Sequence, residues 1–171
     1  DLENWIGINE FDLGRYGDAL KWFKSAHQVF VTFEKPPVNF YAQLLIAIGD
    51  FETSEQILMP IASSEDLRHN EIDDLSLLGK TYFEWERFDA AVPHLRRAWS
   101  LAQTSGVKWL TTLVGNYYSE LLLEPAFVGY DPDAAEQIIG VVEQHAIEGG
   151  WHRSHALALA RKSSAALAHQ N

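Results

Sequence analysis

The chain has 171 residues, the length of one ordinary domain, and its 47% hydrophobic and 22% charged residues are typical of a folded protein. Lys and Arg total 13 against 24 Asp and Glu, and the formal net charge of −11 disfavours binding to nucleic acids and anionic membranes. The sequence has no cysteine, which excludes disulfides, thiolate zinc sites and cysteine nucleophiles.

The ends of the sequence and its longest apolar runs bear on where the protein works. No apolar run reaches the roughly 18 residues of a membrane span, and no signal peptide opens the chain. We therefore expect a cytoplasmic protein without a membrane partner. Because the sequence opens Asp-Leu-Glu-Asn-Trp without a methionine, we expect residues 1–171 to be a single domain that is either cut from a larger protein or a processed product.

Apolar residues recur at spacings of three and four along the whole chain, which is typical of amphipathic helices and not of strands. Asn70 is a predicted N-cap, as is Asp131 before Pro132, whereas Gly106 and Gly149-Gly150 are predicted helix stops. In chain order, the predicted helices cover residues 1–13, 16–33, 37–48, 51–62, 70–85, 88–104, 107–123, 132–147 and 151–169.

The same array of residue types occurs three times at intervals of about 36 residues. The first array is Ile6-Gly7, Phe11, Tyr16, Ala19, Phe23 and Ala26, and the second is Tyr41-Ala42, Leu45, Gly49, Phe51, Ser54, Leu58 and Ile61. The third is Leu78-Gly79, Tyr82, Phe88, Ala91, Leu95 and Ala98. Three copies in register indicate an internal repeat.

The segments GINEFDLGRYGDALKWFKSA and LLGKTYFEWERFDAAVPHLRRA resemble tetratricopeptide repeats, helix–turn–helix units of about 34 residues. The resemblance is strongest for residues 1–27 and 70–104, moderate for 37–62 and weakest for 107–171. It implies an all-α fold, a right-handed α-solenoid of about four repeats plus a final helix. Val114-Gly115 and Tyr118 resemble the first helix of a fourth unit, and its second helix contains Ala135, Ile139 and Val142. The segment LEPAFVGYDPD is an insertion between these two helices.

Several single residues have roles that the resemblance implies. Gly7, Gly79, Ala19 and Ala91 would lie where the two helices of a unit approach closely, and Tyr16, Phe51 and Phe88 would anchor the turns. Glu86 stands in place of a turn glycine. Pro60 and Pro93 fall within second helices, so kinks or early helix ends are expected there.

In this family the first helix of each unit lines a concave groove in which proteins or peptides bind. The positions implied to face the groove are Asn4, Ile8, Phe11, Asn39, Gln43, Ile46, Ser76, Lys80, Phe83, Thr112, Asn116 and Ser119. Their amides could bond a peptide backbone. Lys80 is the main cation of the set, which disfavours the family's known recognition of acidic peptide tails.

No residue pattern predicts catalysis, a metal or a cofactor. His152 and His155 share a helical face, with Glu143 and His145 one helix earlier, but we interpret them as a solvated helix start. The acidic pairs Glu65-Asp66, Asp73-Asp74, Glu84/Glu86 and Asp131/Asp133 are expected at helix ends or on exposed faces. Trp85 and Trp109 are the tryptophans expected to be partly exposed for recognition.

These observations favour a non-enzymatic protein–protein interaction module. By analogy of fold, it would be the regulatory or sensing region of a larger bacterial signalling protein, of the transcription-activator or cyclic-dinucleotide-cyclase type. The alternatives are an assembly or secretion scaffold, a co-chaperone-like adaptor, a spacer that binds nothing, and a helical enzyme with an unrecognised site. Leu157, Leu159 and Leu167 of the last helix would lack a covering helix, so a homodimer through this helix is a further expectation.

Overall fold

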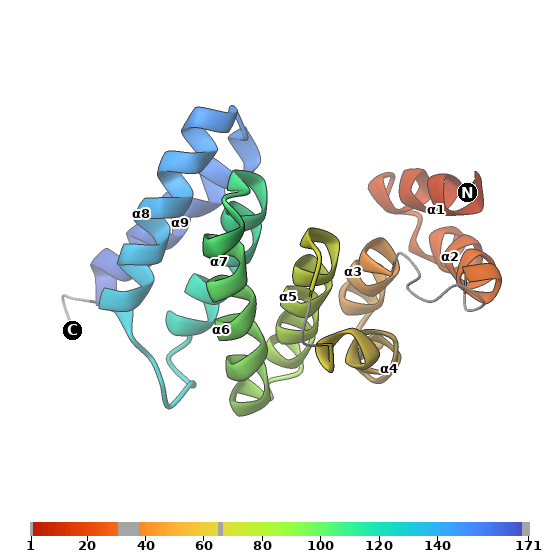
Figure 1. The fold of residues 1–171 in the computed structure, drawn as a ribbon, viewed down its shortest axis with the longest axis horizontal. Coiled ribbons are helices and arrows are strands. Elements are labelled where there is room, and N and C mark those ends of the chain that lie inside the picture. Colours follow the sequence, from red (N-terminus) through yellow and green to blue (C-terminus); the bar gives the residue numbers. More distant parts are fainter. Residues whose placement is uncertain (1, 31–37, 65–66, 169–171) are drawn as a thin grey trace.

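The computed structural model describes residues 2–30, 38–64 and 67–168, and the regular secondary structure of these residues is entirely helical (Figure 1). The helices are α1 (Leu2–Asp12), α2 (Tyr16–Phe30), α3 (Asn39–Ile48), α4 (Phe51–Ala62), α5 (His69–Glu84), α6 (Phe88–Ser105), α7 (Lys108–Leu122), α8 (Pro132–Gly149) and α9 (His152–Ala168). An all-α fold is thus confirmed. The predicted helical positions 1, 31–33, 37 and 169 lie outside the described residues.

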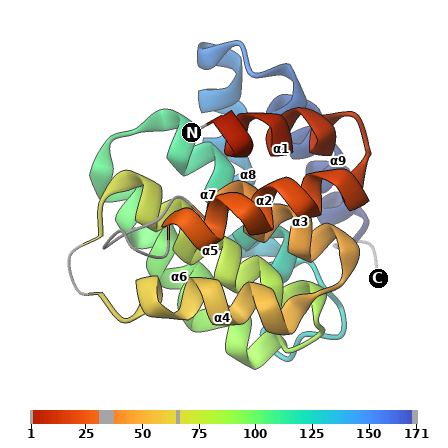
Figure 2. The same ribbon diagram turned by 90° about the vertical axis from the view of Figure 1, so that its right-hand side faces the viewer.

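The helices follow one another along the longest axis of the molecule, from α1 and α2 at one end to α8 and α9 at the other (Figure 1). Seen from the α1–α2 end, the later helices lie behind this first pair (Figure 2). Each helix packs on its neighbours in the chain, and α3, α5, α7 and α9 also contact one another in succession. Because α5 is surrounded by α3, α4, α6 and α7, the consecutive residues 71–79 are all buried.

The turn within the first three helix pairs has the same backbone geometry each time. A residue with positive φ follows the first helix of each pair: Gly14 (73°), Gly49 (79°) and Glu86 (58°). The next N–H donates to the carbonyl five residues earlier, in the pairs Arg15–Glu10 (2.8 Å), Asp50–Leu45 (2.9 Å) and Arg87–Tyr82 (2.8 Å). The prediction that Glu86 replaces a turn glycine is confirmed, and this left-handed conformation is costly for a residue with a Cβ.

The fourth pair closes its turn with the same kind of hydrogen bond over a longer loop. The N–H of Asp131 donates to the Leu122 carbonyl at 2.9 Å, nine residues apart instead of five. In every pair, the residue four positions after this N–H donor (Arg15, Asp50, Arg87 or Asp131) is fully buried. These four residues are Ala19, Ser54, Ala91 and Ala135, all 0% exposed. The predicted insertion therefore amounts to four residues within the turn.

The predicted close helix contacts are confirmed. A Cβ on Gly7 would lie 2.9 Å from the Phe23 ring, and one on Gly79 would lie 2.5 Å from Leu95 Cγ. Such distances are shorter than atoms tolerate, so only glycine lets these helices approach so closely.

Two local predictions need correction. Asn70 is not the cap of α5, because the helix begins at His69 and the Glu71 carboxylate accepts from the Arg68 backbone N–H at 2.6 Å. Of the two outcomes expected at Pro93, the early helix end is wrong, since α6 continues to Ser105. The Asp131 cap is confirmed, with its carboxylate accepting from the Ala134 N–H at 2.9 Å.

Candidate binding groove

A hollow of about 380 Å³, here named the groove pocket, lies between the ends of α5 and α7 and the middle of α9. Its lining consists of Phe83, Glu120, Leu123, Glu124, Leu157, Ala160, Arg161 and Ser164. Apolar side chains from α5, from α9 and from Leu123, which follows α7, thus lie beside charged ones. Such a mixture of apolar surface and a few fixed polar groups is typical of binding sites.

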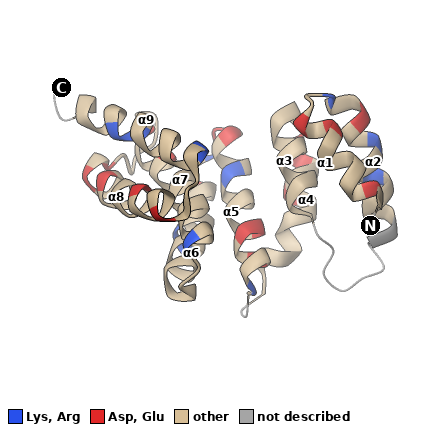
Figure 3. Ribbon diagram, turned by 90° about the horizontal axis from the view of Figure 1, so that it is seen from above, with Lys and Arg blue, Asp and Glu red and all other residues tan. Residues whose placement is uncertain are grey.

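A network of ion pairs joins the three helices at this pocket. Glu120 Oε2 lies 2.8 Å from Lys80 Nζ and 3.0 Å from Arg161 Nη2, and Lys80 Nζ also lies 2.6 Å from Glu84 Oε1. Arg161 donates a further hydrogen bond to Asn116 Oδ1 at 3.0 Å. The side chains of Lys80 and Arg161 are only 14% exposed. Figure 3 shows the basic position of α5 between acidic ones along the helix.

The network also fixes the aromatic side chains nearby. Lys80 Nζ lies 4.7 Å from the centre of the Phe83 ring and 5.9 Å from that of Tyr117. Burial raises the pKa of the Tyr117 hydroxyl, and the negative charges of Asp73 and Glu120 raise it further. Tyr117 therefore stays protonated at every physiological pH.

The structure brings only part of the predicted groove set to this site. Lys80 and Asn116 belong to the ion-pair network, and Phe83 lines the groove pocket. Three predicted residues with hydroxyl side chains are buried: Ser76, Thr112 and Ser119. The hydroxyls of Ser76 and Ser119 donate to carbonyls of their own helices, so they are unavailable as ligand donors.

The predicted residues of the first two units lie away from the groove pocket. Ile8 and Phe11 are half-buried against the cluster that joins α1, α2 and α3, and Ile46 packs against the central core. Asn4 and Gln43 are half-buried on α1 and α3. Asn39 Nδ2 faces Asp73 Oδ2 at 3.4 Å, a long contact that links α3 to α5.

The positions predicted on α7 are displaced by one helical turn. The sequence predicts that Gly115 is the equivalent of Gly79. The hydrogen bonds that close the two turns instead make Leu122 the equivalent of Tyr82. Ser119, three residues before Leu122, is then the equivalent of Gly79, three residues before Tyr82. The positions equivalent to Ser76, Lys80 and Phe83 are then Asn116, Glu120 and Leu123. This shift explains why Thr112 and Ser119 are buried while Glu120 and Leu123, which were not predicted, line the pocket.

The prediction that Asp73 and Asp74 lie at a helix end or on an exposed face is wrong. Both are buried, with accessible fractions of 6% and 5%. The Oδ1 atom of each lacks a hydrogen-bond partner among the described residues. Burial raises the pKa of Asp73 to about 6, and burial with the nearby charges of Asp73 and Glu71 raises that of Asp74 to about 8. Asp74 is therefore mostly protonated at neutral pH.

The other acidic pairs differ from this one. Glu84, Glu86, Asp131 and Asp133 are exposed, as predicted. Glu65 and Asp66 lie outside the described residues.

The remaining candidates lie at other places on the surface. Within residues 2–30, 38–64 and 67–168, no three His, Cys, Asp or Glu side chains form a group that could hold a metal, and His152 is exposed. Trp109 is 43% exposed, and Trp85 is half-buried with its ring 5.9 Å from that of Phe51, so the predicted partial exposure of both is confirmed.

The apolar side chains predicted to be uncovered on the last helix are indeed exposed. The accessible fractions are 41% for Leu157, 45% for Leu159 and 61% for Leu167. Of these, only Leu157 lines the groove pocket.

Comparison of the chain with models of known protein families, with curated proteins and with solved structures finds no match. In the part of the chain that the structure describes, no helix is both long and apolar enough to cross a membrane.

Proposed function

We propose that the chain is a right-handed solenoid of tetratricopeptide-like helix pairs that binds a protein or peptide segment without catalysing a reaction. Two observations support the architecture: the recurring turn geometry and the succession of contacts among α3, α5, α7 and α9. In helical repeat proteins such stacking creates an extended surface for partners.

The groove pocket is the observation that carries the binding function. Its apolar side chains offer a place for an apolar residue of the partner, and the exposed fraction of Leu157 is 41%. Lys80 and Arg161 are already paired with Glu120, so they are not free to neutralise an acidic tail. A partner therefore gains its affinity chiefly by burying apolar surface.

The wider setting rests on the resemblance alone. We propose a cytoplasmic regulatory or sensing region of a larger bacterial signalling protein, of the transcription-activator or cyclic-dinucleotide-cyclase type. A scaffold for assembly or secretion, or a co-chaperone-like adaptor, would use the same groove. In each of these settings the module binds protein and not nucleic acid, in keeping with its net charge of −11.

Selection from a random peptide library displayed on phage tests this function. Peptides selected on the unmodified chain should bind the Leu157→Glu variant at least about tenfold more weakly, because the new charge would face the buried apolar part of the ligand. Leu159→Glu is the matched control, because Leu159 lies on the same helix at similar exposure but outside the pocket. Equal loss in both variants, or failure to select any peptide, would contradict the proposal.

A further inference from the structure

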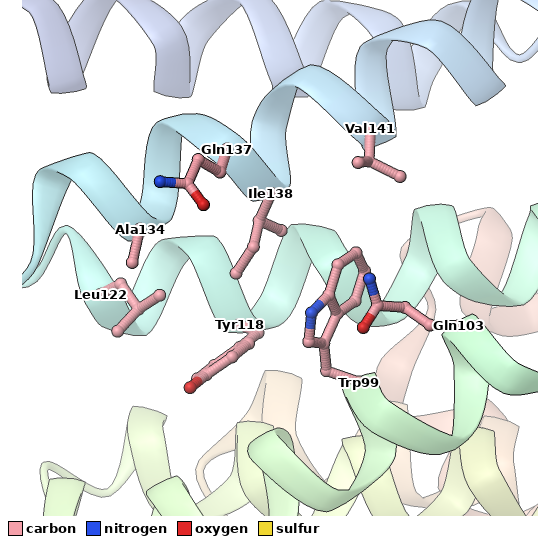
Figure 4. A pocket seen from close by; sticks show the side chains of 8 residues that line it. All are labelled: Trp99, Gln103, Tyr118, Leu122, Ala134, Gln137, Ile138 and Val141. Atoms are coloured by element: carbon pink, nitrogen blue, oxygen red, sulfur yellow. The ribbon is translucent and has the colours of Figure 1, made fainter.

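A second hollow, of about 350 Å³, lies between α6, α7 and α8 and shares no residue with the groove pocket (Figure 4). We name it the amide–aromatic pocket. Its lining residues are Trp99, Gln103, Tyr118, Leu122, Ala134, Gln137, Ile138 and Val141. None of these eight residues carries a charge, although the chain as a whole is strongly acidic.

The pocket has an apolar floor, aromatic walls and an amide rim. Leu122 and Ile138 are buried at its base, and the rings of Trp99 and Tyr118 are half-buried. In Figure 4 the Trp99 ring lies between Tyr118 and Gln103, with the side chains of α8 on the opposite side. Because Gln103 and Gln137 are exposed, a ligand can reach the pocket without any movement of the helices.

Gly115 is the reason that the Trp99 ring can lie against α7. A Cβ at Gly115 would lie 2.9 Å from Trp99 Cζ3 and 2.5 Å from Val142 Cγ2. The missing side chain therefore leaves the space that the edge of the indole occupies. A large ring held on one side by backbone presents its remaining surface to a ligand at little entropic cost.

Four polar side chains of the pocket have no hydrogen-bond partner among the described residues: Trp99, Gln103, Tyr118 and Gln137. The indole N–H can only donate, and the phenol and the two amides can donate as well. Since the phenol and the amides can also accept, the indole N–H is the group that requires an acceptor, and a matching ligand is uncharged with an acceptor placed against it. It also offers flat apolar surfaces to the two rings.

We propose that the amide–aromatic pocket binds a proline-rich segment of a partner protein in the polyproline II conformation. Proline has no backbone N–H, so such a segment presents carbonyl acceptors without competing donors. Its pyrrolidine rings pack on aromatic faces, and aromatic-lined grooves are the usual receptors of this conformation. An acidic or basic segment would leave its charge without a counter-charge in this pocket.

Nuclear magnetic resonance can test the proposal, because each tryptophan side chain gives one indole N–H signal and the chain has six. The ¹⁵N-labelled protein is titrated with a short uncharged proline-rich peptide and, in parallel, with a glycine–serine peptide of equal length. The Trp99 signal is identified as the one that is missing from the spectrum of the Trp99→Phe variant. In the unmodified protein this signal should shift when the proline-rich peptide is added and stay in place when the glycine–serine peptide is added. The Trp109 signal should stay in place, since Trp109 does not line the pocket.

Two variants distinguish the pocket from unspecific binding. Trp99→Phe keeps an aromatic ring but removes the donor, and Gln137→Ala removes an exposed amide that the fold does not need. Each should lower the affinity for the proline-rich peptide by up to about tenfold, which corresponds to the loss of one hydrogen bond. Trp109→Phe should leave this affinity unchanged. If the peptide leaves the Trp99 signal unmoved, or if a neutral oligosaccharide shifts it and the peptide does not, the proposal is wrong.

Discussion

Replacing Asp74 by asparagine should stabilise the protein at neutral pH, although it removes a buried acid from the centre of α5. Asp74 is 5% exposed, and its Oδ1 atom has no hydrogen-bond partner among the described residues. Burial, with Asp73 and Glu71 nearby, raises its pKa from 3.8 to about 8. The carboxyl group is thus protonated in the folded chain under conditions that ionise it in the unfolded chain.

The size of the effect follows from this difference in proton binding. Between about pH 4 and pH 8 the folded state binds more protons than the unfolded state, so the free energy of unfolding falls as the pH rises. Each pKa unit is worth about 1.4 kcal/mol, which gives up to about 4 kcal/mol at pH 7. Because the charge of Asp73 is one cause of the raised pKa of Asp74, and Asp73 itself is partly protonated near pH 6, we expect a gain of about 2–4 kcal/mol from Asp74→Asn at pH 7.

Urea unfolding at a series of pH values from about 5 to 8 is the assay. The unmodified chain should lose stability steeply across this range, and Asp74→Asn should lose much less. Asp89→Asn, at an exposed position of α6, is the control and should change stability by less than about 0.5 kcal/mol. If Asp74→Asn is less stable than the parent at pH 7, or keeps the same pH dependence, the carboxyl group is not buried as described.

Four further changes test other parts of the structure. Gly79→Ala should lower the free energy of unfolding by about 1–3 kcal/mol, because its Cβ would meet Leu95, whereas Gly140→Ala, with open space around it, should be neutral or stabilising in the same urea titration. Glu86→Gly should raise the free energy of unfolding by about 1 kcal/mol, and with it the melting temperature, because φ is 58° at that residue. An unchanged or lower melting temperature would argue against the left-handed turn. Glu120→Gln should cost about 1 kcal/mol and speed hydrogen exchange in α9, because Lys80 and Arg161 lose their shared carboxylate; slower or equal exchange would count against the network. If the exposed side of α9 mediates a homodimer, Leu167→Glu, at a site 61% exposed, should lower the mass seen by sedimentation at high protein concentration, and an unmodified chain that is already monomeric there would refute the dimer.

The helices were predictable from the sequence because their signals are local. The Asp131-Pro132 start and the Gly106 stop depend on backbone groups within one turn of the residue itself. The tight contacts at Gly7 and Gly79 were also predictable, because small residues recur there at a fixed spacing.

The parts of the candidate site that were mispredicted depend on tertiary structure. The register of α7 could not be read from Gly115, since the length of the turn before Asp131 becomes clear only from the hydrogen bond to Leu122. The burial of Asp73 and Asp74 follows from the four helices around α5, which a polar sequence pattern does not indicate. Arg161 was missed because its partner Glu120 lies 41 residues earlier.

The closing bond between Asp131 and Leu122 makes the loop between them a natural insertion point for protein engineering. The bond joins the two ends of the loop, while within the loop Phe127 packs into the central core against Phe88. Val128, which is 97% exposed, marks its outermost part. Loop-closure entropy rises by only about 0.6 kcal/mol for each doubling of length. A foreign epitope or fluorescent reporter grafted at Val128 would therefore be carried on the outside of the array, as long as Phe127 keeps its place in the core and Leu123 and Glu124 keep theirs in the groove pocket.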